Sequence, residues 1–426
     1  MVKYVINESE LYPSKDEQLL LKNKTKEVTN VLSSFVKKNK IKADVFVGGS
    51  YAKGTLAKQK EYDIDVFVRF FDEVNADKLE RAVNETASKL KLKYERVHGS
   101  RDYFFIVANE SVVFEIVPVK KIKKPREMEN STDLSYFHVN YIKKKLKNRK
   151  LIREILLAKA FFKAQEVYGA ESWIHGFSGY SVECLIIYYK TLDKMLKEFV
   201  KAYDKKELPI VIDIEKFYKN KHEILINMNE SKRKGPIVFI EPTWKERNVL
   251  AALEYSTFEK IVESAKSYLK RPSKYFFIKK EFNKDEFEIL ARKKDAHFIN
   301  IQLETNKQVG DIAGAKLVKG GNYVISLLEK RFDIIERKII YHLNNYADVY
   351  IVLKEKKDLE IKGPSVKMNK HAIAFQSEHP EAYVKKGHLY YKLQKIGNVH
   401  DFIKKILDKC SGNLKDMSIV RVEMKN

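Results

Sequence analysis

The alternation of apolar and polar residues between positions 45 and 70 predicts two strands joined by a glycine turn and a short helix. The first apolar run ends in a Gly-Gly-Ser turn, and the second begins at Ile64. Because side chains alternate between the two faces of a strand, Asp63 and Asp65 share one face and lie roughly 7 Å apart. Two carboxylates so placed repel each other unless a cation lies between them, and carboxylate oxygens suit Mg²⁺.

The glycine turn itself has the features of a phosphate cradle. Glycine lets backbone N–H groups come close to a phosphate, which makes Gly49 a candidate nucleotide contact. Ser50 stands where the N-cap residue of the short helix is expected. Either feature alone is usually an ordinary turn or a solvated strand end, but here a Lys-Gly-Thr segment follows at 53–55. The combination predicts a site for a nucleoside triphosphate and its metal ions.

A third acidic residue, Glu115, lies inside a later apolar run, V-V-F-E-I-V-P-V. A charge within such a strand is costly unless it is paired or bound to a metal. The alternative is an edge strand on which Glu115 faces water. A third carboxylate on a neighbouring strand is what a two-metal site needs. We therefore take Asp63, Asp65 and Glu115 as the candidate catalytic and metal-binding residues.

The pattern along the rest of the chain predicts an α+β fold with several domains. Helices are expected within 7–41, 72–90, 151–202 (two helices), 257–270, 285–292 and 320–342. Strands are expected at 94–97, 103–107, 112–119, 237–240, 276–278, 297–303 and 349–354. A helix containing Arg247 is expected to begin at Thr243, and a turn is expected at 362–364.

Charge is the most informative feature of the composition. The 426 residues include 82 Lys and Arg against 58 Asp and Glu, a formal net charge of +24. Such an excess favours a polyanionic partner such as nucleic acid, although a lysine-rich genome gives the same bias. The most basic runs, 120–126 and 143–150, are either RNA-phosphate contacts or solvated surface.

The chain carries no obvious signal for a membrane or for secretion. No run approaches the ~20 apolar residues of a membrane helix, and the N-terminal stretch lacks a basic region followed by an apolar core. The two cysteines, Cys184 and Cys410, are too few for a disulfide framework or a four-cysteine zinc site. We expect buried thiols in a cytoplasmic protein.

Several motifs together resemble known enzymes. The order GS, KGT and D-x-D resembles the DNA polymerase β-like nucleotidyltransferase superfamily. VYGAE at 167–171, GFSGY at 176–180 and E-P-x-x-x-x-R-N-V at 241–249 resemble, more specifically, the archaeal class I CCA-adding enzymes, tRNA nucleotidyltransferases that build the 3′-terminal CCA without a nucleic-acid template. The resemblance extends from about residue 20 to about residue 395, with order and spacing kept.

The resemblance assigns roles to individual residues. It implies that Asp63, Asp65 and Glu115 hold two Mg²⁺ ions, with Glu115 where the family generally has Asp. It implies nucleotide contacts from Gly49, Ser50, Lys53, Ser135, His138, Lys159, Tyr168 and Arg247. Lys53 stands where Arg is usual, Ser135 where Thr is usual, and Glu241 where Asp is usual. Ordinary packing or surface roles remain the alternatives for His138, Lys159, Tyr168 and Arg247.

The resemblance also implies a domain plan and a reaction. A nucleotidyltransferase catalytic domain is expected at 1–142, a mostly helical domain completing the nucleotide site at 143–257, and an α+β RNA-binding body and tail at 258–426. Nucleotides from CTP and ATP would be added to the 3′ end of tRNA with release of pyrophosphate. The protein would bind the tRNA at its acceptor stem. The alternatives are a poly(A) polymerase-like nucleotidyltransferase and a catalytically inactive RNA-binding protein. A homodimer is left open.

Overall fold

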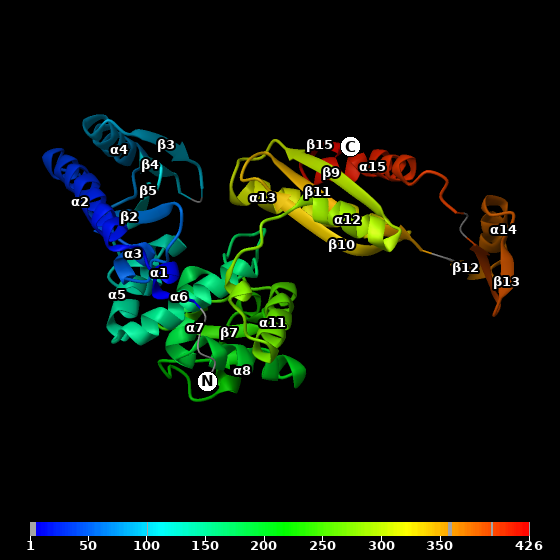
Figure 1. Cartoon of the computed structure of the whole chain (residues 1–426), viewed down its shortest axis with the longest axis horizontal. Helices are drawn as coiled ribbons and strands as arrows, with labels where there is room; N and C mark the ends of the chain where they lie inside the picture. Colours follow the sequence, from blue (N-terminus) through cyan, green and yellow to red (C-terminus); the bar gives the residue numbers. More distant parts are fainter. Residues whose placement is uncertain (1–5, 100, 357–359, 393–394, 426) are drawn as a thin grey trace. The chain divides into compact units, whose positions relative to one another are not determined.

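The computed structural model describes residues 6–99, 101–356, 360–392 and 395–425. The chain divides into two compact units, Met1–Lys280 and Glu281–Asn426, and both mix helices with sheets (Figure 1). The α+β multidomain class expected from the sequence is therefore confirmed. Within the described part of the chain, no helix combines the length and the apolar character that crossing a bilayer requires.

The first unit contains a five-stranded sheet with the order β1-β2-β5-β4-β3. Its strands are β1 (Ala43–Val47), β2 (Tyr62–Phe70), β3 (Lys93–Val97), β4 (Tyr103–Asn109) and β5 (Val112–Lys120). Strands β2 and β5 are parallel, and the other neighbouring pairs are antiparallel. The short helix α3 (Gly49–Lys53) connects β1 to β2 as expected. This sheet positions the acidic residues.

Two amphipathic helices cover one face of this sheet (Figure 1). The N-cap residue of helix α2 (Lys15–Lys38) is Ser14, whose side chain accepts a hydrogen bond from the Glu17 backbone. The Glu17 carboxylate in turn accepts a hydrogen bond from the Ser14 backbone. Helix α4 (Ala76–Leu90) buries its apolar side in the same core. The β2 residues on this face are Ile64, Val66, Val68 and Phe70, which leaves the alternate residues, with both aspartates, on the opposite face.

A helical region with its own core follows in the same unit. Its main helices are α5 (Ser135–Lys145), α6 (Arg149–Ala164), α7 (Gly179–Tyr189), α8 (Leu192–Asp204) and α11 (Tyr255–Lys270). Residues 151–202 thus form most of three helices, where two were expected. The break arises because Lys190 adopts φ 73° and Thr191 then caps α8 through the Lys194 backbone.

A small sheet of order β6-β7-β8 lies in the same unit. Its strands are β6 (Ile210–Ile212), β7 (Ile237–Glu241) and β8 (Trp244–Asn248). The expected helix beginning at Thr243 was wrong, because Arg247 lies on β8. The Glu241 side chain accepts hydrogen bonds from the backbone and hydroxyl of Thr243, which closes a tight turn and returns the chain as an antiparallel strand.

The second unit is built on a four-stranded antiparallel sheet of order β10-β11-β9-β15. Its strands are β9 (His297–Thr305), β10 (Phe332–Tyr341), β11 (Tyr346–Glu355) and β15 (Ile419–Lys425). Helices α13 (Asp311–Leu328) and α15 (Val399–Asp416) contribute to one core against this sheet, and α12 (Lys284–Lys294) packs against β9 and β11. A second sheet joins β12 (Glu360–Ser365), β13 (Tyr383–Lys385) and β14 (His388–Lys392), next to α14 (Asn369–Glu378).

Three local expectations in the C-terminal half were wrong. The helix expected over 320–342 begins earlier and ends at Leu328, and β10 follows because its residues pair with β11 over nearly their whole length. Residues 362–364 belong to β12, where a register shift relative to β14 makes the irregularity. The expected strand at 276–278 overlaps a short 3₁₀ helix, Lys274–Phe277.

Candidate active site

The sheet register brings the three acidic residues onto one surface. On the parallel strands β2 and β5, Asp65 is the register partner of Glu115, and Asp63 is the partner of Val113. Neighbouring strands lie about 4.8 Å apart, and paired residues project to the same face. Asp63 is exposed, while Asp65 and Glu115 are half-buried. The structure therefore brings together the three carboxylates that the sequence singled out.

The electrostatics of these carboxylates favour a cation. Burial, with the charges of Asp65 and Asp63, raises the pKa of Glu115 to about 7. Burial also raises the pKa of Asp65, against the lowering effect of Lys53, and the pKa of Asp63. Within the described residues, no group of three His, Cys, Asp or Glu side chains is arranged to hold a metal as it stands. The three carboxylates repel one another, and their oxygen atoms form a donor set that fits a hard divalent ion.

The glycine turn lies directly against Asp65. Gly49 has φ 58°, and a Cβ at this position would lie 1.6 Å from Asp65 Oδ2, so only glycine fits. The N-cap of α3 is Gly48, where the sequence suggested Ser50, and Gly48 donates its N–H to the Asp65 carbonyl over 2.8 Å. The Gly48 carbonyl accepts from the Ala52 N–H, so the helix begins before Ser50, whose own carbonyl accepts from the Thr55 N–H.

A buried charged cluster lies next to the turn. Glu183 on α7 is fully buried and accepts hydrogen bonds from Lys53 Nζ at 2.6 Å, Thr55 Oγ1 at 2.5 Å and Lys159 Nζ at 2.8 Å. Burial acts to raise the pKa of Glu183, but Lys159 and Lys53 lower it to about 2. Sequence reasoning found both lysines and missed Glu183. The available signal was a single acid within the apolar helix that follows GFSGY.

A second network joins α5, α7 and the β7–β8 turn. The His138 ring stacks on the Tyr180 ring, with centroids 3.9 Å apart. Glu241, 1% exposed, accepts a hydrogen bond from the Tyr180 hydroxyl at 2.6 Å, and its other oxygen lies 3.4 Å from His138 Nε2. Burial acts to raise the pKa of Glu241, but His138, Tyr180 and Arg247 lower it overall. Lys53 Nζ lies 5.7 Å from the Tyr180 ring centroid and links the two networks.

The remaining predicted residues border these networks. Ser135 is the first residue of α5 and lies one turn before His138, so both share a side of the helix. Tyr168 lies against GFSGY, because a Cβ on Gly179 would approach its hydroxyl to 2.6 Å. Arg247 Nη1 is buried and finds no hydrogen-bond partner among the described residues. Its charge nevertheless acts on Glu241, which places Arg247 beside the His138 network.

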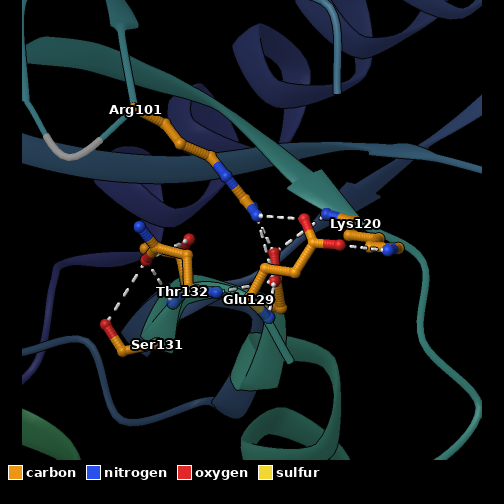
Figure 2. Close-up of polar contacts among 7 residues, drawn as sticks. Arg101, Lys120, Glu129, Ser131 and Thr132 are labelled. Atoms are coloured by element: carbon orange, nitrogen blue, oxygen red, sulfur yellow. Dashed lines mark hydrogen bonds and ion pairs between the residues drawn. The ribbon is translucent and has the colours of Figure 1, made fainter. Parts of the chain in front are cut away.

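An acidic anchor fixes the loop that leads into α5. Asp133 is 3% exposed and accepts hydrogen bonds from the backbone N–H groups of Lys120, Glu129 and Asn130 and from the Arg101 guanidinium. Figure 2 shows the Arg101 side chain extending toward Glu129, with Lys120 on the other side of Glu129. Burial acts to raise the pKa of Asp133, but these donors lower it overall. No sequence pattern predicted this anchor.

Comparisons with known proteins identify the family of this chain. A family model described as a nucleotidyltransferase domain matches residues 28–155, and one described as the second domain of tRNA nucleotidyltransferase matches residues 153–278. The CCA-adding enzyme of Nanoarchaeum equitans is 32% identical over 94% of this chain and 95% of its own length. The CCA-adding enzyme of Methanocaldococcus jannaschii is 28% identical over 98% of this chain and 92% of its own length.

A solved structure supports the fold. The RNA terminal uridylyl transferase Cid1 superposes with a TM-score of 0.50 at 13% identity, covering 64% of this chain and 96% of that chain. At this identity the likeness concerns the fold alone. The family follows from the relatives that match nearly end to end, together with the two domain matches. The chain belongs to the family of CCA-adding enzymes, the tRNA nucleotidyltransferases.

Proposed function

We propose that this protein adds CCA to the 3′ end of tRNA without a nucleic-acid template, using CTP and ATP. The observation that carries the proposal is the trio Asp63, Asp65 and Glu115 on adjacent strands beside the Gly49 turn, in a chain related end to end to CCA-adding enzymes. In each cycle the tRNA 3′-hydroxyl oxygen forms a bond to the α-phosphorus of the nucleotide. The bond from that phosphorus to the bridging oxygen breaks, pyrophosphate leaves, and the hydroxyl proton is released to water.

The acidic residues and the glycine turn have separate tasks in this scheme. Asp63, Asp65 and Glu115 would hold two Mg²⁺ ions, which when bound neutralise the triphosphate and make the 3′-hydroxyl more acidic. Gly49 and Ser50 offer backbone and hydroxyl groups to the phosphates. Lys53 presents a positive charge to the same group.

The helical region would hold the sugar and the base. We assign Ser135, His138 and Tyr168 to the sugar and phosphates, and Arg247 to the base edge together with RNA phosphate. The buried, unpartnered Nη1 of Arg247 supports this assignment, because such a donor gains from an acceptor on a ligand. Lys159 already donates three hydrogen bonds, so we assign it to holding Thr55 and Glu183 behind the phosphates.

The partner would be tRNA, recognised by the shape and phosphates of its acceptor stem. A-form duplexes offer little sequence readout, and the net charge of +24 supports a phosphate-directed grip. We propose the cytoplasm as the location, since tRNA, CTP and ATP occur there together.

The test is incorporation of labelled CTP and ATP onto tRNA transcripts that lack CCA, CA or A, in the presence of Mg²⁺. We expect C, C and A to be added in that order and addition to stop there. The double variant Asp63→Ala, Asp65→Ala is the control and is expected to be inactive. An extending product ladder would instead favour a poly(A) polymerase-like enzyme. Intact tRNA binding without incorporation would favour an inactive RNA-binding protein.

A further inference from the structure

Glu183 is a buried acid for which the reaction scheme has no direct use. It lies on α7, is fully buried, and joins residues from three parts of the first unit. One carboxylate oxygen, Oε2, accepts from Lys53 at the end of α3. The other oxygen, Oε1, accepts from Thr55 just after α3 and from Lys159 on α6. A buried carboxylate with three donors is held in one orientation, and it holds its partners in turn.

The two lysines bound to Glu183 are not equivalent. An ammonium group has three N–H donors. Lys159 uses all three, on the Thr55 carbonyl at 3.0 Å, on Thr55 Oγ1 at 3.2 Å and on Glu183. Lys53 donates one hydrogen bond within the described part of the chain, to Glu183. Lys53 therefore keeps N–H groups for a ligand, whereas Lys159 does not.

Lys53 lies beside the proposed nucleotide site, with 8% of its side chain exposed. Its charge acts on Asp65, and its ammonium lies near the ring of Tyr180, which stacks on His138. A lysine carries a point charge on a flexible stem and lacks the fixed fork of an arginine. Here a carboxylate at 2.6 Å fixes the direction of that stem.

We propose that Glu183 is a positioning residue that aims Lys53 at the triphosphate of CTP and ATP. The proposal rests on the function proposed above. Oε1 anchors the carboxylate to Thr55 and Lys159, and Oε2 then determines where the Lys53 ammonium lies. Without Glu183, the Lys53 ammonium loses the acceptor that determines its direction, and its flexible stem turns away toward water.

The competing explanation is that Glu183 serves stability alone, by balancing the buried charge of Lys159. Both explanations predict that Glu183→Gln lowers the melting temperature. They differ on ligand binding. Positioning of Lys53 matters for every ligand with a triphosphate, whichever base it carries, and it matters little for tRNA alone.

The test measures equilibrium binding of CTP, ATP and inorganic tripolyphosphate to the full chain, in Mg²⁺ and without tRNA, so that no transfer takes place. The matched control is Glu154→Gln. Glu154 is 5% exposed on α6 and accepts from the Leu192 backbone at 2.9 Å, and within the described residues it forms no ion pair with either lysine of the cluster. We expect Glu183→Gln to weaken the binding of all three ligands by roughly tenfold to a hundredfold. This fold-change corresponds to the free energy of one charge-assisted hydrogen bond. Glu154→Gln should stay within about twofold of the unaltered protein.

A second variant separates positioning from charge balance and guards against misfolding. Glu183→Gln combined with Lys159→Met removes one opposite pair of buried charges and leaves Lys53, which costs less stability than removing Glu183 alone. We expect the double variant to bind tripolyphosphate as weakly as Glu183→Gln does. Recovery of binding in the double variant would overturn the proposal, as would equal weakening in Glu154→Gln.

These measurements also stand apart from the proposed function. A protein that binds tripolyphosphate through Glu183 and Lys53 but adds no CCA would leave this inference intact and refute the function. A Glu183→Gln variant that binds all three ligands normally and still adds CCA would refute the inference alone.

Discussion

Asp65 on β2 and Glu115 on β5 are register partners on adjacent parallel strands, so their carboxylates project side by side from one face of the sheet. The register fixes the two backbones, and the length of each side chain then decides where its carboxylate lies. Glu115 is one methylene longer than the Asp that the family generally has at this position. The charge at this position and its reach can therefore be tested separately.

We predict that Glu115→Gln lowers CTP and ATP incorporation by roughly a hundredfold or more, because a neutral amide cannot stabilise the charge of the bound metals. Glu115→Asp should keep more activity than Glu115→Gln, since the charge remains and only its position changes. Single-turnover rates on tRNA lacking CCA measure both. Glu110→Gln, an exposed acid in the β4–β5 turn, is the control and should behave like the unaltered protein. Full activity of Glu115→Gln would remove Glu115 from the site.

The sequence predicted the strands that carry the three acidic residues well, because their pattern is local. Asp63, Asp65 and Glu115 interrupt runs of apolar residues, and a period of two assigns the faces without knowledge of the rest of the fold. Glu183 also interrupts an apolar run, but that run does not indicate which residues it pairs with. Its partner Lys53 is 130 residues away, and only the tertiary fold brings the two side chains together.

The error over 320–342 has a similar origin. Glycines at 314, 320 and 321 weaken the helical pattern of α13, yet a Cβ on Gly320 would lie 2.9 Å from an Ile419 side-chain carbon. The glycines let the helix approach the sheet closely, which is a tertiary requirement. The segment after the helix is equally apolar, and its pairing with β11 decides that it is a strand.

The acid sensitivity of the protein should depend on Glu183. Its pKa is about 2 in the folded chain against an ordinary value of 4.5, so its contribution to stability is fully present above about pH 4.5 and is lost as the pH falls toward 2. We predict that the difference in unfolding free energy between the unaltered protein and Glu183→Gln is largest at neutral pH and shrinks below pH 4.5. Urea unfolding at neutral pH and at two acidic values measures it.

Glu154 provides an internal contrast of opposite sign. Burial raises its pKa above 4.5, so its contribution is fully present below that pH and is lost as the pH rises through the raised value. On acidification, the unaltered protein should therefore gain unfolding free energy relative to Glu154→Gln. Parallel pH dependence in the two variants would contradict both pKa directions.

Asp133 should matter more for stability than its surface neighbour. In Asp133→Asn one oxygen becomes an NH₂ group that faces backbone donors, and the Arg101 guanidinium loses its buried partner. We predict a loss of roughly 3–5 kcal/mol in unfolding free energy. Glu129→Gln removes the exposed end of the same cluster and should cost less than about 1 kcal/mol. Denaturant unfolding measures the loss in each variant. Equal losses would contradict the assignment of Asp133 as the anchor of this cluster (Figure 2).

The same anchor should affect the nucleotide site. Asp133 lies two residues before Ser135, at the entry to the helix that carries His138. Where Asp133→Asn remains folded, we expect the KM for CTP to rise while tRNA affinity is unchanged. An unchanged KM in a folded variant would restrict Asp133 to a structural role.

Binding of tRNA should weaken steeply with salt, and the basic run at 143–150 should account for part of the slope. In this run Lys144 and Lys147 are exposed; Lys144 lies in the last turn of α5, and Lys147 follows the helix. Each lysine that contacts a phosphate releases about one counterion, so Lys144→Gln with Lys147→Gln should reduce the slope of log K against log salt by up to about 2.

The matched control is Lys205→Gln with Lys206→Gln, which changes the net charge equally at the end of α8. If net charge alone drove binding, both double variants would lose affinity to the same extent. A larger loss for the 144/147 pair, with a smaller slope and unchanged tripolyphosphate binding, would show that this run contacts RNA directly, and an unchanged slope would show that it does not.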